Sequence, residues 1–563
     1  MPLLTEMVYS PPNRAMSSEI ERMSAEIRRY RSGELPEEAF KKFRLENGIY
    51  GIRFQKDLQM IRIKIPYGLV TSEQMDMLGE IADIFSIGKG HVTTRQAVQF
   101  HWLTLESVPE VLRKLAEVGL TSREACGNTI RNITACPLSG VSQDEIFDIN
   151  PYAEVLGKFF LRNPLNQNLP RKFKIVLESC ETDHAALGMH DIGIQAMFRK
   201  KNDGSKEKGF KIWVGGGLGP PPFAAEPLEE FTPLDQLLVT CEAIVRIFDR
   251  LGNRDNMSRA RLKFIIMKLG WDEFRRVVLK ERVSVFATRA GDRTWKIEEY
   301  EEEMPQNLPK ASERVDDSPE YERWRKTNVF PQKQEGYYYV FVTLPAGDIT
   351  YEQFGALGRV GRRYAGGVLR TTRTQNLVFR WIRQDLLTDL YADLKKAGLA
   401  MYGAHSIFNV VGCPGADTCN LAITHSHTLA LELHERFSKI PELALADDLK
   451  DLDIKVSGCP NSCGQHHIAD IGFYGSAQRV DGKMAPYYTL LLGGEVSKGK
   501  AIFGQPTTKV PAKNVPDAIL RLVEMYRARR NPGETFREWV RRNQSESGDE
   551  PTGMEEEVVV SGR

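Results

Sequence analysis

The sequence lacks any apolar run long enough to cross a bilayer, and its first residues lack the basic, apolar and small-residue segments of a secretion signal. It also lacks an excess of either charge. Seventy-six basic against seventy-five acidic side chains leave a formal net charge of +1, which implies no general affinity for nucleic acid. These absences predict a cytoplasmic protein with neither membrane nor nucleic acid as a partner.

Cysteine is scarce, and a nucleotide-binding fingerprint is missing. Eight cysteines in 563 residues are too few for a disulfide scaffold. No Gly-x-Gly-x-x-Gly lies between a strand and a helix, and the glycine run at 215–219 has a different spacing. The chain therefore has no flavin or nicotinamide domain of its own. A close approach of backbone to a flat ligand explains Gly215 and Gly216 better than a phosphate loop does.

Four of the cysteines lie in two short pairs, each of which begins with Gly-Cys-Pro. The spacing is Cys413-x5-Cys419, then 39 residues, then Cys459-x3-Cys463. Four convergent thiolates can hold zinc or an iron–sulfur cluster, and the five-residue gap argues mildly against zinc. Buried cysteines without a metal remain an alternative. The same alternative is the first interpretation of the other four, Cys126, Cys136, Cys180 and Cys241.

The chain repeats itself at a shift of about 279 residues. Thr93-Thr-Arg95 returns as Thr371-Thr-Arg373, and Asn132-Ile-Thr-Ala-Cys136-Pro returns as Asn409-Val-Val-Gly-Cys413-Pro. Cys180 falls opposite Cys459. One long repeat indicates duplication with a pseudo-twofold axis. Because Cys136 and Cys180 each lack the second cysteine of their pair, we expect no cluster in the N-terminal half.

Each repeat has the pattern strand, helix, strand, helix. Residues 61–66 alternate as a half-buried strand does, and residues 72–85 have helical apolar spacing. Residues 91–103 are predicted as a further strand and residues 107–120 as a helix. The charged, proline-rich residues 290–336 are predicted as an exposed crossover between the halves.

Cationic and amide side chains occur in small groups on successive predicted strands and loops of the N-terminal repeat. Arg62 and Lys64 share one face of a predicted strand, and Arg95, Gln99 and His101 share a face of the next. Two further groups are Arg131-Asn132 before the Cys136 loop and the pair Lys172 and Lys174. A solvated strand face explains any one of these alone. Together they predict a site for an anionic ligand, since arginine pairs bidentately with carboxylates.

With these residues in place, the chain resembles the siroheme- and iron–sulfur-dependent nitrite and sulfite reductase family, in particular the ferredoxin-type assimilatory sulfite reductase hemoproteins. The resemblance extends from about residue 45 to about residue 545. It implies two cofactors, siroheme and a 4Fe-4S cluster. It also implies that Cys413, Cys419, Cys459 and Cys463 hold the cluster, and that the Cys463 sulfur is also the axial ligand of the siroheme iron.

The resemblance assigns roles to the polar residues as well. It implies that substrate is bound by Arg62, Arg131, Lys172 and Lys174. It implies that siroheme is contacted by Arg95, Gln99, His101 and Asn132, with Gly215 and Gly216 close to the macrocycle. One departure is His91, which stands where some relatives have an arginine. That departure puts one siroheme carboxylate contact in doubt.

The fold class that follows is α+β, a duplicated nitrite/sulfite reductase fold with ferredoxin-like half-domains and two larger α/β cofactor-binding domains. The expected domains are a helical arm at 1–44, half-domains at 45–122 and 337–402, a siroheme- and substrate-binding domain at 123–289, a linker at 290–336, a cluster-binding domain at 403–545 and a disordered tail at 546–563.

The function expected from the resemblance is the six-electron reduction of sulfite to sulfide. Nitrite-selective relatives tend to carry asparagine at the Lys174 position, so the lysine favours sulfite over nitrite, whose reduction to ammonia is the alternative. A non-catalytic iron–sulfur redox protein is a second alternative, which would have no need of four cations in register. Electrons are expected from a ferredoxin, or from a flavoprotein reductase. Seven arginines between Arg521 and Arg542 form either a docking patch or an ordinary solvated face.

Overall fold

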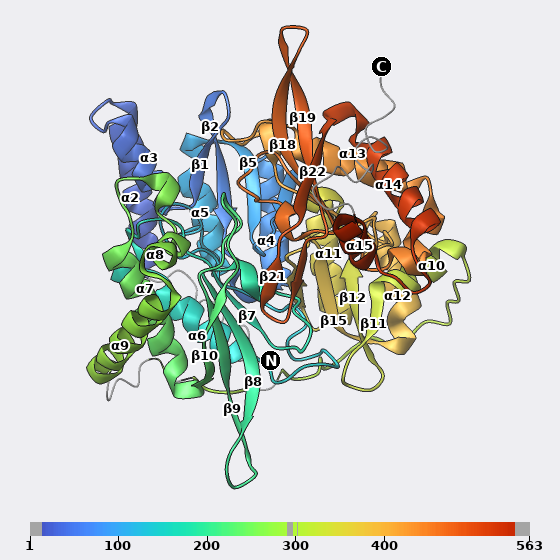
Figure 1. The fold of residues 1–563 in the computed structure, drawn as a ribbon, viewed down its shortest axis with the longest axis horizontal. Coiled ribbons are helices and arrows are strands. Elements are labelled where there is room, and N and C mark those ends of the chain that lie inside the picture. Colours follow the sequence, from blue (N-terminus) through green and yellow to red (C-terminus); the bar gives the residue numbers. More distant parts are fainter. Residues whose placement is uncertain (1–13, 290–294, 296, 301, 547–563) are drawn as a thin grey trace.

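A computed structural model gives the fold for residues 14–289, 295, 297–300 and 302–546 (Figure 1). Strands in this part of the chain form four five-stranded sheets and one two-stranded sheet. None of the helices described is long and apolar enough to span a bilayer. The predicted disordered tail lies outside the described residues apart from Glu546, and so do residues 1–13 of the predicted arm.

The first ferredoxin-like sheet contains four strands of the N-terminal half and one of the C-terminal half. In spatial order they are β1 (Ile49–Ile52), β2 (Gln55–Ile63), β5 (Val98–Thr104), β4 (Lys89–Val92) and β13 (Asp348–Thr350). Its helices are α4 (Ser72–Phe85) and α5 (Val108–Glu117), and the N-terminal arm adds α2 (Arg14–Arg31) and α3 (Glu37–Glu46).

The second ferredoxin-like sheet repeats this arrangement. Its order is β11 (Val329–Pro331), β12 (Tyr337–Val342), β15 (Leu377–Arg383), β14 (Val368–Thr371) and β3 (Leu69–Thr71). Its helices are α10 (Pro319–Asn328), α11 (Tyr351–Tyr364) and α12 (Leu387–Lys396). The predicted helix at 72–85 is confirmed as α4, which begins with a capping box between Thr71 and Gln74. Its counterpart α11 begins with the same box, between Thr350 and Gln353.

The two half-domains exchange one strand each. β3 pairs with β14 of the other half, and β13 pairs with β4. α4 and α11 pack closely because each has a glycine at the contact. A Cβ added at Gly79 would lie 3.1 Å from the Phe354 Cβ, and one at Gly358 would lie 2.5 Å from the Asp76 Oδ1. One hydrophobic core therefore serves both half-domains, with side chains such as Phe100 and Phe354 in it.

The two larger domains are mixed sheets with helices against them. The first has the order β10 (Glu226–Pro233), β9 (Lys206–Val214), β8 (Ile192–Lys200), β7 (Ile175–Glu178) and β6 (Thr134–Ala135). The second has the order β16 (Val410–Gly412), β17 (Ile454–Ser457), β18 (Ile471–Val480), β19 (Lys483–Leu492) and β22 (Gln505–Pro511). The helices of the first domain are α6 (Asn150–Phe160), α7 (Leu237–Leu251), α8 (Leu262–Leu269) and α9 (Trp271–Arg289). Those of the second are α13 (Ser426–Ser438), α14 (Val515–Arg529) and α15 (Phe536–Glu546). β20 (Glu495–Ser497) and β21 (Lys500–Ile502) form the two-stranded sheet.

The pseudo-twofold relation predicted from the repeat is visible in the backbone. The Cys136 amide donates to Leu177 O at 2.9 Å, and its counterpart, the Cys413 amide, donates to Val456 O at 3.2 Å. In each domain the three strands that come first in the chain, β6 to β8 and β16 to β18, pair in parallel. The hairpins β8–β9 and β18–β19 project from opposite ends of the molecule (Figure 1).

Two local predictions are wrong. Residues 91–103 are not one strand, because a tight turn at Thr93–Ala97 separates β4 from β5. Gln96 has a φ of 53° in this turn. Its side-chain Nε2 donates to backbone oxygens of both halves, Ala135 O at 2.8 Å and Thr371 O at 2.9 Å. Residues 290–336 are not an exposed crossover throughout, because α10 buries Trp324 completely in the shared core.

Candidate active site

The four paired cysteines lie in two loops at the carboxyl ends of neighbouring parallel strands. Cys413 and Cys419 follow β16, and Cys459 and Cys463 follow β17. Backbone and side-chain amides point at two of the sulfurs. The Gly458 amide donates to Cys413 Sγ at 3.2 Å, and Asn461 Nδ2 donates to Cys459 Sγ at 3.4 Å. Such donors stabilise thiolate ligands.

The spacing of these sulfurs does not fit a single zinc ion. A tetrahedral zinc with Zn–S bonds of about 2.3 Å needs sulfurs about 3.8 Å apart. Within the described residues, no three of these four sulfurs lie within 4.8 Å of one another. A four-iron cluster, which binds one cysteine at each iron, holds its sulfurs farther apart. The arrangement therefore favours the cluster.

A cavity of about 120 Å³ joins the cysteine loops to the cationic residues of the N-terminal half. Its wall includes the predicted residues Arg62, Arg95, Gln99, Arg131, Asn132, Lys172, Lys174, Cys413 and Cys463. The Cys463 sulfur lies close enough to Lys172 and Lys174 for a thiolate there to favour their protonated forms. The two predicted groups, thiolates and cations, thus meet at one place.

Strand pairing and short extended segments position the cations. Arg62 on β2 lies directly opposite Gln99 on β5. With the Gln99 side-chain amide turned so that its oxygen faces the guanidinium, that oxygen accepts from Arg62 Nη2 and Nε at 2.5 and 2.6 Å. Lys172 and Lys174 flank Phe173, which is buried. Both lysines lie in the extended segment just before β7 and not in a strand. Because side chains alternate sides along an extended segment, the two lysines share one side, and both line the cavity.

The cavity carries buried positive charge with unsatisfied donors. Burial lowers the pKa of Lys172 to about 8. Burial, together with Arg95 and Lys172, lowers the pKa of Lys174 well below its ordinary value. Arg95 Nε and Nη1 and Arg131 Nε are buried donors without a hydrogen-bond partner, and Asn132 Oδ1 is a buried acceptor without one. Because unpaired buried donors are costly, the three arginine atoms fit an anionic ligand such as a carboxylate-rich macrocycle or a small oxyanion.

His91 lies in the cavity wall. Its Nδ1 is 3.3 Å from Asp348 Oδ1, and its Nε2 is 3.2 Å from Gln375 Nε2. Asp348 also contacts His427 Nε2 at 3.0 Å. His91 therefore belongs to a side-chain network that crosses between the two halves.

Three predicted cofactor contacts do not reach the cavity wall. His101 is on β5 but is absent from the wall, and burial lowers its pKa to about 3. Gly215 and Gly216 also lie elsewhere, and protein atoms fill the space beside them. A Cβ at Gly215 would lie 2.3 Å from the Ile266 Cδ1, and one at Gly216 would lie 2.6 Å from Gly188 O. Both glycines are therefore required by close protein packing, and their approach to the macrocycle stays a prediction.

Sequence reasoning missed the residues that tie the Cys463 loop to the N-terminal half. Thr94 Oγ1 donates to Cys463 O at 3.0 Å, and Gln465 Nε2 donates to Thr94 O at 3.3 Å. Gln375 Oε1 accepts from the Gly412 amide at 2.9 Å, just before Cys413. The repeated Thr-Thr-Arg motif was the signal for the first of these contacts, since each copy leads from a strand into a tight turn.

Comparison with known proteins agrees with this architecture. The sequence model described as "Nitrite and sulphite reductase 4Fe-4S domain" matches residues 126–285 and 403–545. The model of the "Nitrite/Sulfite reductase ferredoxin-like half domain" matches residues 53–118 and 330–397. Both therefore match twice, once in each half of the chain.

Individual relatives match over most of the chain. An assimilatory ferredoxin-dependent nitrite reductase of Haloferax mediterranei is 30% identical over 86% of this chain and 82% of its own length. A sulfite reductase [ferredoxin] 1 of Mycolicibacterium paratuberculosis is 29% identical over the same shares. The solved structure of the Mycobacterium tuberculosis NirA protein superposes with a TM-score of 0.76 at 25% identity, and the match covers 95% of this chain and 97% of that one.

The cysteine loops, the cationic cavity and the duplicated fold thus occur together in a chain that both family models match. The α+β fold with repeated ferredoxin-like half-domains is confirmed. The chain belongs to the nitrite and sulfite reductase family of oxidoreductases, and its cofactors are a 4Fe-4S cluster and a siroheme.

Proposed function

We propose that this chain reduces sulfite to sulfide. The reaction consumes one sulfite dianion, six electrons and seven protons, and it yields one hydrosulfide ion and three water molecules. The observation that carries the proposal is the second lysine of the cavity, Lys174, which lines the wall together with Lys172 and the arginines. Sulfite near neutral pH is largely a dianion and nitrite a monoanion, so each added cation favours sulfite.

The cationic residues have separable tasks in this proposal. Arg95, with two unpaired buried donors, would hold carboxylates of the siroheme, and Cys463 would be the ligand shared by the two cofactors. A bound siroheme would supply an iron for the substrate and a path for the electrons of the cluster. Arg62, Arg131, Lys172 and Lys174 bind the substrate oxygens and stabilise charge that develops on them.

Protons come from the same lysines. A pKa of about 8 keeps Lys172 mainly protonated at neutral pH and still allows it to release its proton to a departing oxygen. Burial also lowers the pKa of Lys174, and the negative charge of a bound anion favours its protonated form. Sulfite needs several such transfers, because each oxygen leaves as water.

Nitrite is the second candidate substrate, and the relatives supply the reason. Those at 29–32% identity include both nitrite and sulfite reductases by name. The cation-lined cavity argues against the other alternative, a non-catalytic redox protein, because such a protein has no need of buried cations beside its cluster. The deciding measurement is kcat/KM for sulfite and for nitrite with reduced ferredoxin. A tenfold preference for nitrite would contradict the proposal.

A ferredoxin is the electron donor that the relatives' names support, since the curated names of the Haloferax, maize and Mycolicibacterium relatives include ferredoxin. The predicted arginine patch is a poor docking surface for it. Arg527 pairs with Asp448, Arg537 with Asp470, Arg541 with Glu495 and Arg542 with Glu534. Their charges are largely matched within the chain, so an acidic carrier would gain little there.

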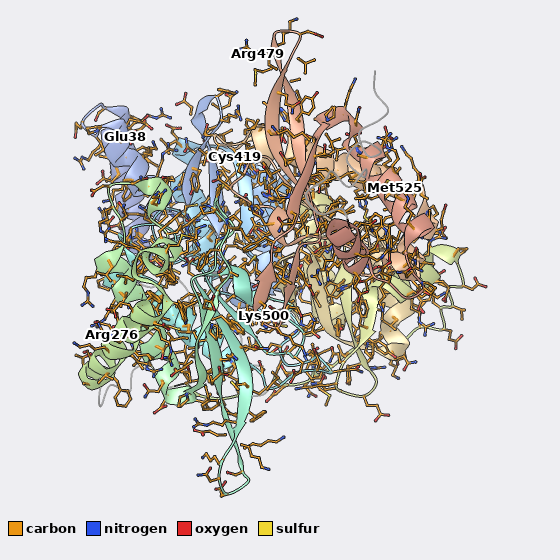
Figure 2. The ribbon with its side chains drawn as sticks, viewed as in Figure 1. Glu38, Arg276, Cys419, Arg479, Lys500 and Met525 are labelled. Atoms are coloured by element: carbon orange, nitrogen blue, oxygen red, sulfur yellow. The ribbon has the colours of Figure 1, made fainter. Side chains whose placement is uncertain are left out.

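The Cys419 loop is a better place for electrons to enter. It lies beside the β1–β2 hairpin, because the Arg53 amide donates to Thr418 O at 3.1 Å and Asn420 Nδ2 donates to Gly51 O at 2.9 Å (Figure 2 labels Cys419). Three large apolar side chains are exposed around it: Phe54 at 86%, Leu421 at 69% and Ile423 at 46%. An exposed apolar group beside a cluster ligand suits a transient protein contact.

A glutamate at Leu421 tests this docking site. We expect Leu421→Glu to lower turnover with reduced ferredoxin by about fivefold or more, because the new charge repels an acidic carrier and removes apolar contact area. Turnover with a small chemical reductant such as reduced methyl viologen should not change. Val283 on α9 is also 69% exposed, so Val283→Glu is the matched control and should alter neither rate. Equal rates for Leu421→Glu and the parent with ferredoxin would place docking elsewhere.

A further inference from the structure

The N-terminal half contains a second convergence of metal-ligating groups. Cys136, Glu178, Cys180 and His184 each offer one ligand atom, and these four atoms all lie within 4.8 Å of one another. Cys136 follows β6 and Cys180 follows β7, so they correspond to Cys413 and Cys459 of the cluster loops. Interpreting Cys136 and Cys180 as ordinary small hydrophobes does not account for this arrangement.

We propose that the N-terminal half binds a zinc ion through Cys136, Cys180, His184 and Glu178, at the position that corresponds to the iron–sulfur cluster in the C-terminal half. The inference does not depend on the proposed substrate. Two thiolates, an imidazole and a carboxylate form a donor set that zinc accepts, and thiolates select it over the hard cations.

The distances match a tetrahedral zinc site. The two sulfurs are 3.8 Å apart, as Zn–S bonds of about 2.3 Å at tetrahedral angles require. Cys136 Sγ is 3.6 Å from His184 Nδ1, and Glu178 Oε1 is 3.8 Å from the same nitrogen. Among the described residues, no three of the cluster cysteines bring their sulfurs within 4.8 Å of one another, which distinguishes the two kinds of site.

The surroundings hold the ligands in place. Glu178 is fully buried, and its carboxylate accepts from the amides of Ser179, Cys180 and Ala185 at 2.9, 3.0 and 2.8 Å. Such outer hydrogen bonds orient a metal ligand. Both cysteines are buried, whereas the His184 side chain is 24% exposed and leaves a route by which an ion can enter.

The site lies where the N-terminal loops meet the second ferredoxin-like sheet. Arg373 Nε donates to His184 O at 2.6 Å, and Arg380 Nη1 donates to Ser139 O at 2.6 Å. Two thiolates and a carboxylate give a zinc complex one net negative charge, and Arg373 lies close enough to Glu178 to offset it. A bound ion would therefore clamp two loops at the junction of the halves.

Metal analysis of the holoenzyme, purified from zinc-supplemented medium, tests the proposal. We expect about one zinc per chain besides the iron. Cys136→Ser and Cys180→Ser should each reduce zinc to about a tenth or less and leave the iron content unchanged. Cys413→Ser should do the reverse, with iron lost and zinc kept. Cys241→Ala is the matched control, since Cys241 is also buried in the N-terminal half but belongs to neither group, and it should keep both metals.

Zinc X-ray absorption identifies the ligands without interference from iron. We expect two sulfurs at about 2.3 Å and two nitrogen or oxygen ligands at about 2.0–2.2 Å. If the serine variants do not fold, His184→Gln removes a partly exposed ligand and should still lower zinc occupancy. A parent without zinc, a zinc with no sulfur ligand, full zinc in His184→Gln, or a Cys136–Cys180 disulfide found by mass spectrometry would each overturn the proposal.

Discussion

Cys463→Ser is expected to abolish six-electron reduction, with a loss of more than about 100-fold in turnover. Removing the outer partners of a metal ligand already costs about 10- to 100-fold, and here a proposed ligand of two cofactors would be lost. The cavity adds to the effect, because Lys172 and Lys174 lose the negative charge that favours their protonated forms. The measurements are turnover with ferredoxin, iron content and the visible absorption spectrum.

Cys241→Ala controls for the loss of a cysteine as such. Cys241 is buried in α7, away from the cavity wall and both cysteine loops, so this variant should keep its spectrum and turnover. If Cys463→Ser instead keeps the absorption bands of both cofactors and the rate of the parent, Cys463 is not the shared ligand. That result would contradict the site assignment but not the family membership.

Lys174→Asn is expected to shift the substrate preference from sulfite towards nitrite. The loss of one cation from the cavity should lower kcat/KM for sulfite at least tenfold more than kcat/KM for nitrite, which corresponds to about 1.4 kcal/mol of differential stabilisation. The reason is the second charge of sulfite, which doubles its attraction to each cation in the cavity. Steady-state kinetics with both anions at one pH and one ionic strength measures the effect.

Lys174→Arg separates charge from shape at the same position. An arginine keeps the cation, so this variant should retain the preference of the parent even if its absolute rates fall. Equal losses for sulfite and nitrite in Lys174→Asn would mean that the residue binds both anions alike. The lysine would then say nothing about the physiological substrate.

The repeat was sufficient to predict a duplicated architecture from the sequence, and the resemblance that the paired cysteines carry supplied the fold class. Matching motifs at a constant shift imply matching structure, and the structure shows it in the paired amide bonds of Cys136 and Cys413. Local propensity also placed α4 correctly, because its capping box lies within a few residues of sequence. The cationic residues Arg62, Lys172 and Lys174 were found for a similar reason, since side-chain alternation shows which residues share a face.

Only the tertiary structure decided how the two halves of the chain pair and which surroundings each face of a strand contacts. The exchange of β3 and β13 pairs residues 297–301 and 257–261 positions apart, and no local pattern specifies such a partner. The turn at Thr93–Ala97 forms because Gln96 bonds to backbone of both halves, so the strand predicted there is interrupted by distant contacts. Side-chain alternation likewise predicts which residues share a face of a strand but not what that face contacts. Gln99 and His101 both lie on β5, yet of the two only Gln99 lines the cavity. Cys136, Cys180 and His184 converge for the same physical reason, because loops from two parallel strands meet only once the sheet has formed.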